Sequence, residues 1–167
     1  MRKIPSDRLD PRLAPLIDCV SVDTLEAEDG TVFAVWEDGR LGYINEAWGH
    51  FARENEGEPV ITEHYPLGTS VYQGMAPPMR RFFASLVKKA LATGRVVAHS
   101  YECSSPTTYR LYHQSLYPVG SRRAVVAVNS LVETHAHPGP SVSHEPDPSL
   151  YRDADGVLSQ CSYCRRV

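Results

Sequence analysis

The most informative part of the chain is Thr31-Val32-Phe33-Ala34-Val35-Trp36-Glu37-Asp38-Gly39-Arg40-Leu41-Gly42-Tyr43-Ile44. It contains two apolar runs of strand-forming residues, separated by the Asp38-Gly39 pair. Asp-Gly between two such runs predicts a β-hairpin, because glycine readily adopts the positive φ of a tight turn. Asn45 follows at once and can cap a short helix over residues 46–53. The stretch therefore predicts strand, turn, strand and helix.

Downstream, glycine and proline residues interrupt 54–77, which should form loops with at most single helical turns. Apolar residues then recur with helical period, and they predict a helix over 78–93 that ends before Gly94. Strand-forming runs joined by short turns follow, and they predict an antiparallel meander. These runs are 96–103, 109–117 and 124–132.

The two ends of the chain differ in composition from this central part, which spans residues 31–133. Residues 1–30 mix prolines with a short apolar patch, so we expect an N-terminal flank that forms a short helix or a docking arm. Residues 134–150 are rich in proline and histidine and predict an extended linker. Residues 151–167 form a C-terminal tail with a Cys-x-x-Cys pair.

Composition excludes several classes of protein. With 167 residues and 42% apolar side chains, the chain can bury one core. A net charge of -3 without a long basic run argues against nucleic-acid binding. No apolar stretch is long enough for a membrane span or a signal peptide, so we expect a cytoplasmic protein with no membrane partner. None of the common hydrolase, nucleotide-loop or metalloprotease motifs occurs, so we do not expect an enzyme.

Two motifs in this order of elements resemble the PAS domain family. Residues 35–48 look like the opening strands of the family, which end in an asparagine at the start of the first helix. Residues 101–106, Tyr101-Glu102-Cys103-Ser104-Ser105-Pro106, look like a bacterial PAS variant with Cys-x-Ser-Pro at its central turn. Arg110-Leu111-Tyr112 and Pro118 continue that match, although the variant often has histidine at the position of Ser104 and an aromatic residue at the position of Leu111.

The resemblance covers residues 31–133 and implies an α+β fold. It implies a PAS-like five-stranded antiparallel sheet with helices on one face and a pocket between them. The implied function is a sensory domain of signal transduction that binds a small molecule or a signalling protein. Since no kinase, cyclase or DNA-binding region is evident in the sequence, we expect its output to act in trans, through a partner or within a homodimer.

Gln114 is the polar residue of greatest interest in the implied pocket. If Tyr112, Gln114 and Leu116 share the helix-facing side of their strand, the Gln114 amide needs a partner among apolar neighbours. That partner can be a ligand, a backbone group or a water molecule. The pocket walls, or simply the core, would be formed by Trp48, Phe51, Met79 and Phe83.

Cofactor chemistry finds limited support. Some PAS-like sensors hold haem through a histidine on the long helix or in the loop before it. The long helix has no histidine, and His64 is the one candidate in the preceding loop. Haem is therefore not expected, also because no Cys-x-x-Cys-His motif occurs. Flavin photochemistry would need a cysteine in the early helical region, and none lies between Val20 and Glu102.

Cys161 and Cys164 form the sharpest chemical motif. Two thiolates at this spacing can supply half of a tetrahedral zinc site. If the turn after Cys103 spans 104–108, His99 lies opposite His113, and about 13 Å separates His99 from Cys103 along the strand. The tail would then meet either Cys103 or the His99/His113 pair. A reversible disulfide and an unliganded tail remain open alternatives, so the rival function is a zinc-binding or thiol-redox regulatory module on a PAS scaffold.

Overall fold

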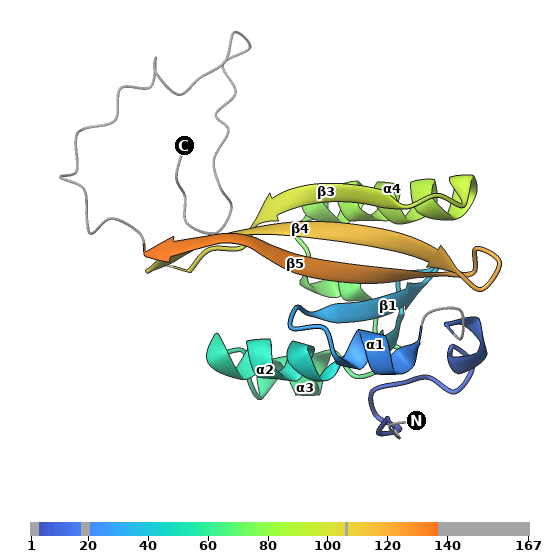
Figure 1. The fold of residues 1–167 in the computed structure, drawn as a ribbon, viewed down its shortest axis with the longest axis horizontal. Coiled ribbons are helices and arrows are strands. Elements are labelled where there is room, and N and C mark those ends of the chain that lie inside the picture. Colours follow the sequence, from blue (N-terminus) through green and yellow to red (C-terminus); the bar gives the residue numbers. More distant parts are fainter. Residues whose placement is uncertain (1–3, 18–20, 106, 137–167) are drawn as a thin grey trace, which may run out of the picture. The chain divides into compact units, whose positions relative to one another are not determined.

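The computed structural model describes residues 4–17, 21–105 and 107–136. They form a five-stranded antiparallel sheet in the order β2-β1-β5-β4-β3, which confirms the predicted α+β class. The strands are β1 (Val32–Trp36), β2 (Leu41–Ile44), β3 (Val97–Glu102), β4 (Thr108–Val119) and β5 (Ala124–Ala136). The helices are α1 (Val22–Glu26), α2 (Glu46–Glu54), α3 (Val60–His64) and α4 (Pro77–Thr93), with 3-10 helices at Ala14–Leu16 and Val71–Gly74 (Figure 1).

The predicted hairpin is confirmed as β1 and β2. Ala34 pairs with Tyr43, and the register shifts between Ala34 and Val35. The turn works because Gly39 has a φ of 81° and its N–H donates to the carbonyl of Trp36 at 2.8 Å. The other edge of β1 pairs with β5, where Trp36 lies opposite Ala124. β1 is therefore an interior strand.

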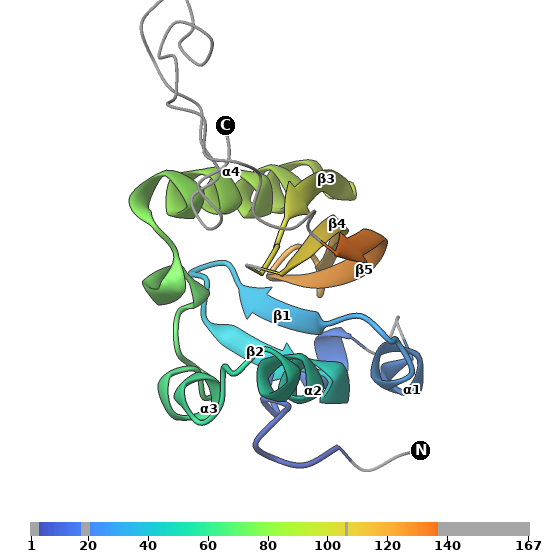
Figure 2. The same ribbon diagram turned by 90° about the vertical axis from the view of Figure 1, so that its left-hand side faces the viewer.

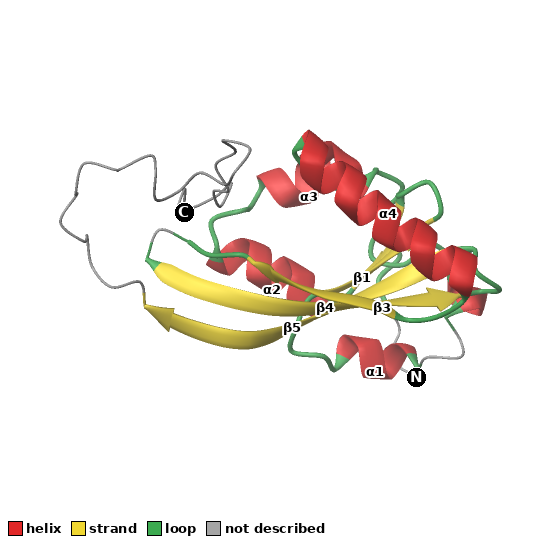
Figure 3. Ribbon diagram, turned by 90° about the horizontal axis from the view of Figure 1, so that it is seen from above, coloured by secondary structure: helices red, strands yellow, loops and turns green. Residues whose placement is uncertain are grey.

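The predicted long helix is confirmed as α4. Gly94 ends it in a left-handed conformation with a φ of 66°. Its buried residues recur at helical spacing, and Figure 3 shows α4 lying over the sheet. α4 forms the first core together with residues from all five strands and one residue of the 3-10 helix Val71–Gly74. This core consists of Phe33, Val35, Leu41, Val71, Phe83, Val87, Ala90, Leu91, Val97, Leu116, Val125 and Ala127.

Asn45 connects several elements from one buried position. It is 1% exposed, and its Oδ1 accepts from the backbone N–H groups of Val32 at 2.9 Å and Trp48 at 3.2 Å. Its Nδ2 donates to the carbonyls of Leu25 at 3.3 Å and Gly30 at 2.9 Å. The expected helix cap is confirmed, and the same amide also fixes the entry to β1.

A second core lies on the opposite face of β1. Leu13 and Ile17 from the N-terminal segment and Leu25 from α1 pack there against Val32 and Ala34. Side chains alternate along a strand, so a strand that is apolar at consecutive positions needs cover on both faces. The sequence predicted a flank that forms a short helix or a docking arm, and the segment does pack on the sheet (Figure 2); its contribution to a core was not predicted.

A buried ionic cluster joins this segment to the sheet. The Arg8 guanidinium lies 3.0 Å from the Glu26 carboxylate, whose side chain is 2% exposed. The Tyr43 hydroxyl donates to Glu26 Oε1 at 2.6 Å. The Arg8 carbonyl also accepts from Ile44 N–H at 3.0 Å, and Leu9 forms a bridge with Tyr43. β2 is an edge strand of the sheet, and the N-terminal segment covers the edge that has no strand partner.

Burial, together with the hydrogen bond to Glu26, raises the pKa of Tyr43 above its usual value of 10.0. The folded protein therefore retains a proton that the unfolded chain loses above about pH 10, so stability falls as pH rises beyond that value. We expect Tyr43→Phe to flatten this fall, measured as the urea midpoint between pH 8 and pH 11. Equal slopes for the variant and the original protein would contradict this assignment.

The chain divides into two compact units, Met1–His99 with His113–Ser130 and Ser100–Tyr112 with Leu131–Val167. The described part of the second unit contains the turn between β3 and β4 and the end of β5. β5 runs to Ala136, which is further than the predicted strand. Among the described residues, no helix is both long and apolar enough to cross a membrane.

Candidate functional site

A chain of hydrogen-bonded polar side chains crosses the sheet on the face that carries the first core. His99 Nε2 lies 3.0 Å from Gln114 Oε1, and Gln114 Nε2 donates to Asn129 Oδ1 at 2.8 Å. Asn129 Nδ2 donates to Thr31, at 2.9 Å to its carbonyl and 3.0 Å to its hydroxyl. Gln114 and Asn129 are 5% and 3% exposed. The Gln114 amide was predicted to need a hydrogen-bond partner, and the side chains of His99 and Asn129 are its partners.

The direction of each bond in this chain follows from its end at Thr31. Asn129 Nδ2 must donate to the Thr31 carbonyl, so Asn129 Oδ1 is an acceptor and Gln114 Nε2 is its donor. Gln114 Oε1 is then left to accept, and a neutral His99 carries its proton on Nε2. The Thr31 carbonyl can only accept, so it favours this one arrangement: turning the amides would bring Asn129 Oδ1 and the Thr31 carbonyl oxygen together.

Aromatic side chains fill the first core beside this chain. The Phe33 ring lies 5.4 Å from the Trp48 ring and 6.2 Å from the Phe83 ring, measured between centroids. The Tyr72 ring lies 6.2 Å from Phe83. At the other side, the Phe82 ring meets His99 at 5.3 Å, edge to face. α4 thus contacts both the aromatic cluster and the first member of the polar chain.

The predicted ligand-binding residues fall into two groups. Trp48, Phe83, Tyr112 and Gln114 are buried or half-buried, and Trp48 and Phe83 both contact Phe33. Phe51 is half-buried in α2. The other two, His64 at the end of α3 and Met79 in α4, are exposed. Within the second unit, Tyr112 stacks on Tyr101 with ring centroids 5.7 Å apart. Their role in ligand binding stays a prediction.

The predicted register between β3 and β4 is wrong by one residue. His99 meets Gln114 and not His113. Ser105 N–H donates to the Thr108 carbonyl at 2.8 Å, so these two residues close a shorter turn than the expected loop over 104–108. A shift of one residue moves side chains to the other face of a sheet. His99 and His113 therefore lie on opposite faces and cannot share a metal ion as a pair.

The remaining metal prediction is tested only in part. Cys103 is half-buried in the second unit, and its N–H donates to the Arg110 carbonyl at 2.9 Å. Cys161 and Cys164 lie outside the described residues. Within 4–17, 21–105 and 107–136, no three histidine, cysteine or acidic side chains gather as a metal site would require. Zinc binding by the tail stays a prediction.

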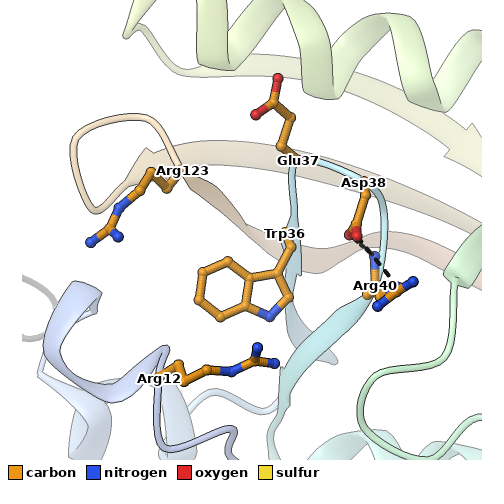
Figure 4. Close-up of a pocket in the computed structure, with 6 residues that line it drawn as sticks. All are labelled: Arg12, Trp36, Glu37, Asp38, Arg40 and Arg123. Carbon is orange, nitrogen blue, oxygen red and sulfur yellow. Dashed lines mark hydrogen bonds and ion pairs between the residues drawn. The ribbon is translucent and has the colours of Figure 1, made fainter.

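A pocket that the sequence did not predict lies beside Trp36 (Figure 4). Its volume is about 580 Å³. The Arg12 guanidinium lies 5.6 Å from the centre of the indole. Three arginines from separate parts of the chain contribute to the lining. The lining residues are Arg12, Trp36, Glu37, Asp38, Arg40 and Arg123.

The strand pairing explains how these residues meet. Trp36 ends β1 opposite Ala124, the first residue of β5, so Arg123 lies next to the turn that follows Trp36. Arg12 precedes Leu13, which is fully buried in the second core. The one local signal was the cluster of charged residues around the Asp38-Gly39 turn. That cluster alone does not indicate a pocket, because Arg123 joins it only through the long-range pairing of β1 and β5.

The order of five antiparallel strands, with α2 and α4 contributing to the core on one face, defines the fold as PAS-like. No family model matches the chain, and no curated protein matches it.

Several solved structures are similar to part of this chain. A domain of an HTR-like protein from Haloarcula marismortui ATCC 43049 is 17% identical, with a TM-score of 0.43, over 64% of this chain and 100% of that domain. The photoactive yellow protein domain of the sensor histidine kinase Ppr from Rhodospirillum centenum is 14% identical, with a TM-score of 0.45, over 68% and 95%. An RNA-binding light-oxygen-voltage receptor is 17% identical, with a TM-score of 0.41, over 80% of this chain and 36% of the receptor. The likeness concerns the fold alone.

Proposed function

We propose that this chain is a sensory domain of signal transduction, and that it senses a small molecule on the helix-facing side of its sheet. The observation that carries the proposal is the chain His99–Gln114–Asn129–Thr31. A ligand with a hydrogen-bonding group can take the place of His99 at Gln114 and turn the amide. Asn129 would then either lose its bond to Gln114 or turn its oxygen toward the Thr31 carbonyl and lose the bond from Nδ2 to that carbonyl.

The polar chain ends where such a change can reach other elements. Asn129 N–H and Nδ2 both donate to the Thr31 carbonyl, at 3.1 Å and 2.9 Å. The residues on either side of Thr31 are held by Asn45, through Gly30 O and Val32 N. Asn45 also caps α2 through Trp48 N. Rearrangement at His99 would therefore alter the start of β1 and the start of α2.

The output of the domain would act in trans. In this proposal, a change at β1 or α2 is read by a partner protein or by a second copy of the chain. We place this activity in the cytoplasm. Binding without catalysis is part of the proposal.

Native mass spectrometry of the full chain, purified without added ligand, tests the proposal. We expect a bound small molecule that denaturation releases, and we expect Gln114→Leu to lose it because leucine offers no hydrogen bond. Gln73→Leu, the same change at an exposed position, should retain the ligand. Chains free of small molecules in every preparation would overturn small-molecule sensing and favour a protein-interaction module.

A further inference from the structure

The Trp36 pocket brings positive charge and an aromatic surface together on the face of β1 that carries the second core. Trp36 packs against that core, whereas Phe33 and Val35 face the first one. The pocket is thus on the other side of the sheet from His99 and Gln114. A ligand in the Trp36 pocket would bind independently of the proposed sensing site.

The three arginines of the pocket differ in their partners. Arg40 Nε pairs with Asp38 at 3.3 Å. Arg12 uses Nε and one terminal nitrogen for Asp10, at 3.1 Å and 2.7 Å, and these bonds lower the pKa of that carboxyl. Its other terminal nitrogen has no hydrogen bond to a described residue. Arg123 donates to the carbonyl of Gly120 at 3.3 Å and forms no ion pair within the described part of the chain.

Arg12 and Arg40 are each paired with an aspartate, and Arg123 is the pocket arginine that has no ion pair among the described residues. Asp38 is already paired with Arg40, and Figure 4 shows the Glu37 carboxylate directed away from the indole and from the other five residues. The guanidinium of Arg123 and the second terminal nitrogen of Arg12 are therefore donors that a bound anion could use. Guanidinium groups bind carboxylate and phosphate oxygens through short charge-assisted bonds.

We propose that this pocket binds a small anion that carries a planar aromatic ring, such as an aromatic carboxylate. The volume of about 580 Å³ lies in the range of small-molecule sites. Trp36 offers the ring an apolar surface, Arg123 offers the acidic group of the ligand a cation, and Arg12, which is paired with Asp10, offers it one terminal N–H group. Arg12 comes from the N-terminal segment and Arg123 from the turn before β5, so the ligand would join parts that are distant in the sequence.

The chain has two tryptophans, and each reports on one face of the sheet. In ¹H–¹⁵N spectra of the full chain, titration with 2-naphthoate should shift the indole N–H signal of Trp36 and leave that of Trp48 in place. The neutral analogue 2-naphthamide and inorganic phosphate should each bind at least about tenfold more weakly, because each lacks one of the two recognised features. The two signals are assigned with Trp36→Phe and Trp48→Phe.

A matched pair of variants tests the role of charge. Arg123→Gln should weaken 2-naphthoate binding about tenfold, while Arg95→Gln, which removes an exposed charge that does not line the pocket, should leave it unchanged. An unshifted Trp48 signal shows that each variant is folded. Equal binding of 2-naphthoate and 2-naphthamide would overturn the proposal, and so would a shift confined to Trp48. A shift confined to Trp48 would overturn the Trp36 pocket only, and the proposed sensing site on the other face would still stand.

Discussion

Asn45→Leu should lower the free energy of unfolding by about 4 kcal/mol, because it leaves several buried backbone groups without partners at about 1–3 kcal/mol each. The amide is 1% exposed and bonds at once to Val32 N, Trp48 N and Gly30 O. Leucine has the same branching at its γ carbon but neither donor nor acceptor. The loss is measured as a fall in the urea midpoint at constant m-value.

Asn55→Leu is the matched control for this change. Asn55 ends α2, is half-buried, and donates to the Phe51 carbonyl at 2.8 Å. It makes that one side-chain bond near solvent, so its replacement should cost about 1 kcal/mol. Equal losses for the two variants would show that Asn45 is an ordinary helix cap and not a junction between elements.

Glu26→Leu should cost about 3 kcal/mol, because removal of one partner from a buried ion pair leaves the other charge uncompensated. Here the charge left behind is that of Arg8, whose NH1 is already buried without a hydrogen bond. The Tyr43 hydroxyl loses its acceptor in the same step. Glu28→Leu, an exposed change just beyond α1, should alter stability far less.

The triple variant Arg8→Met, Glu26→Leu and Tyr43→Phe sharpens this prediction. An apolar set of similar volume removes the unpaired charge and the unpaired hydroxyl together, so the triple variant should be more stable than Glu26→Leu alone. Thermal or urea unfolding of the original protein, the three single variants and the triple variant measures the order. A triple variant that loses the sum of three single losses would mean that the cluster stabilises the fold by more than its desolvation costs.

Local signals in the sequence account for the parts of the fold that could be predicted. The Asp38-Gly39 turn, the Asn45 cap and the apolar period of α4 each act within a few residues, and each appears where it was expected. The register of β3 and β4 depended on one turn. The turn closed by Ser105 and Thr108 is shorter than the expected loop over 104–108, and the resulting shift of one residue in the register separates His99 from His113.

Long-range packing accounts for what was missed. The apolar residues before residue 31 are spaced irregularly among prolines, so they gave no periodic signal for the second core. The clue lay in β1 itself, where Val32, Phe33, Ala34 and Val35 are buried in succession. The Trp36 pocket was hidden for a similar reason, since Arg12 and Arg123 meet it only after the sheet has formed.

Consecutive burial along β1 also affects how the chain avoids misfolding. A strand that is apolar on both faces can slip by one residue without exposing an apolar side chain, so hydrophobicity alone does not choose between the two alignments. Polar and steric contacts at the ends of β1 must therefore determine which of the two alignments forms. At the start, a side chain on Gly30 would overlap the Asn129 carbonyl, and Asn45 accepts from Val32 N–H. We infer that loss of Asn45 also permits misaligned sheets, which would appear as a slow refolding phase.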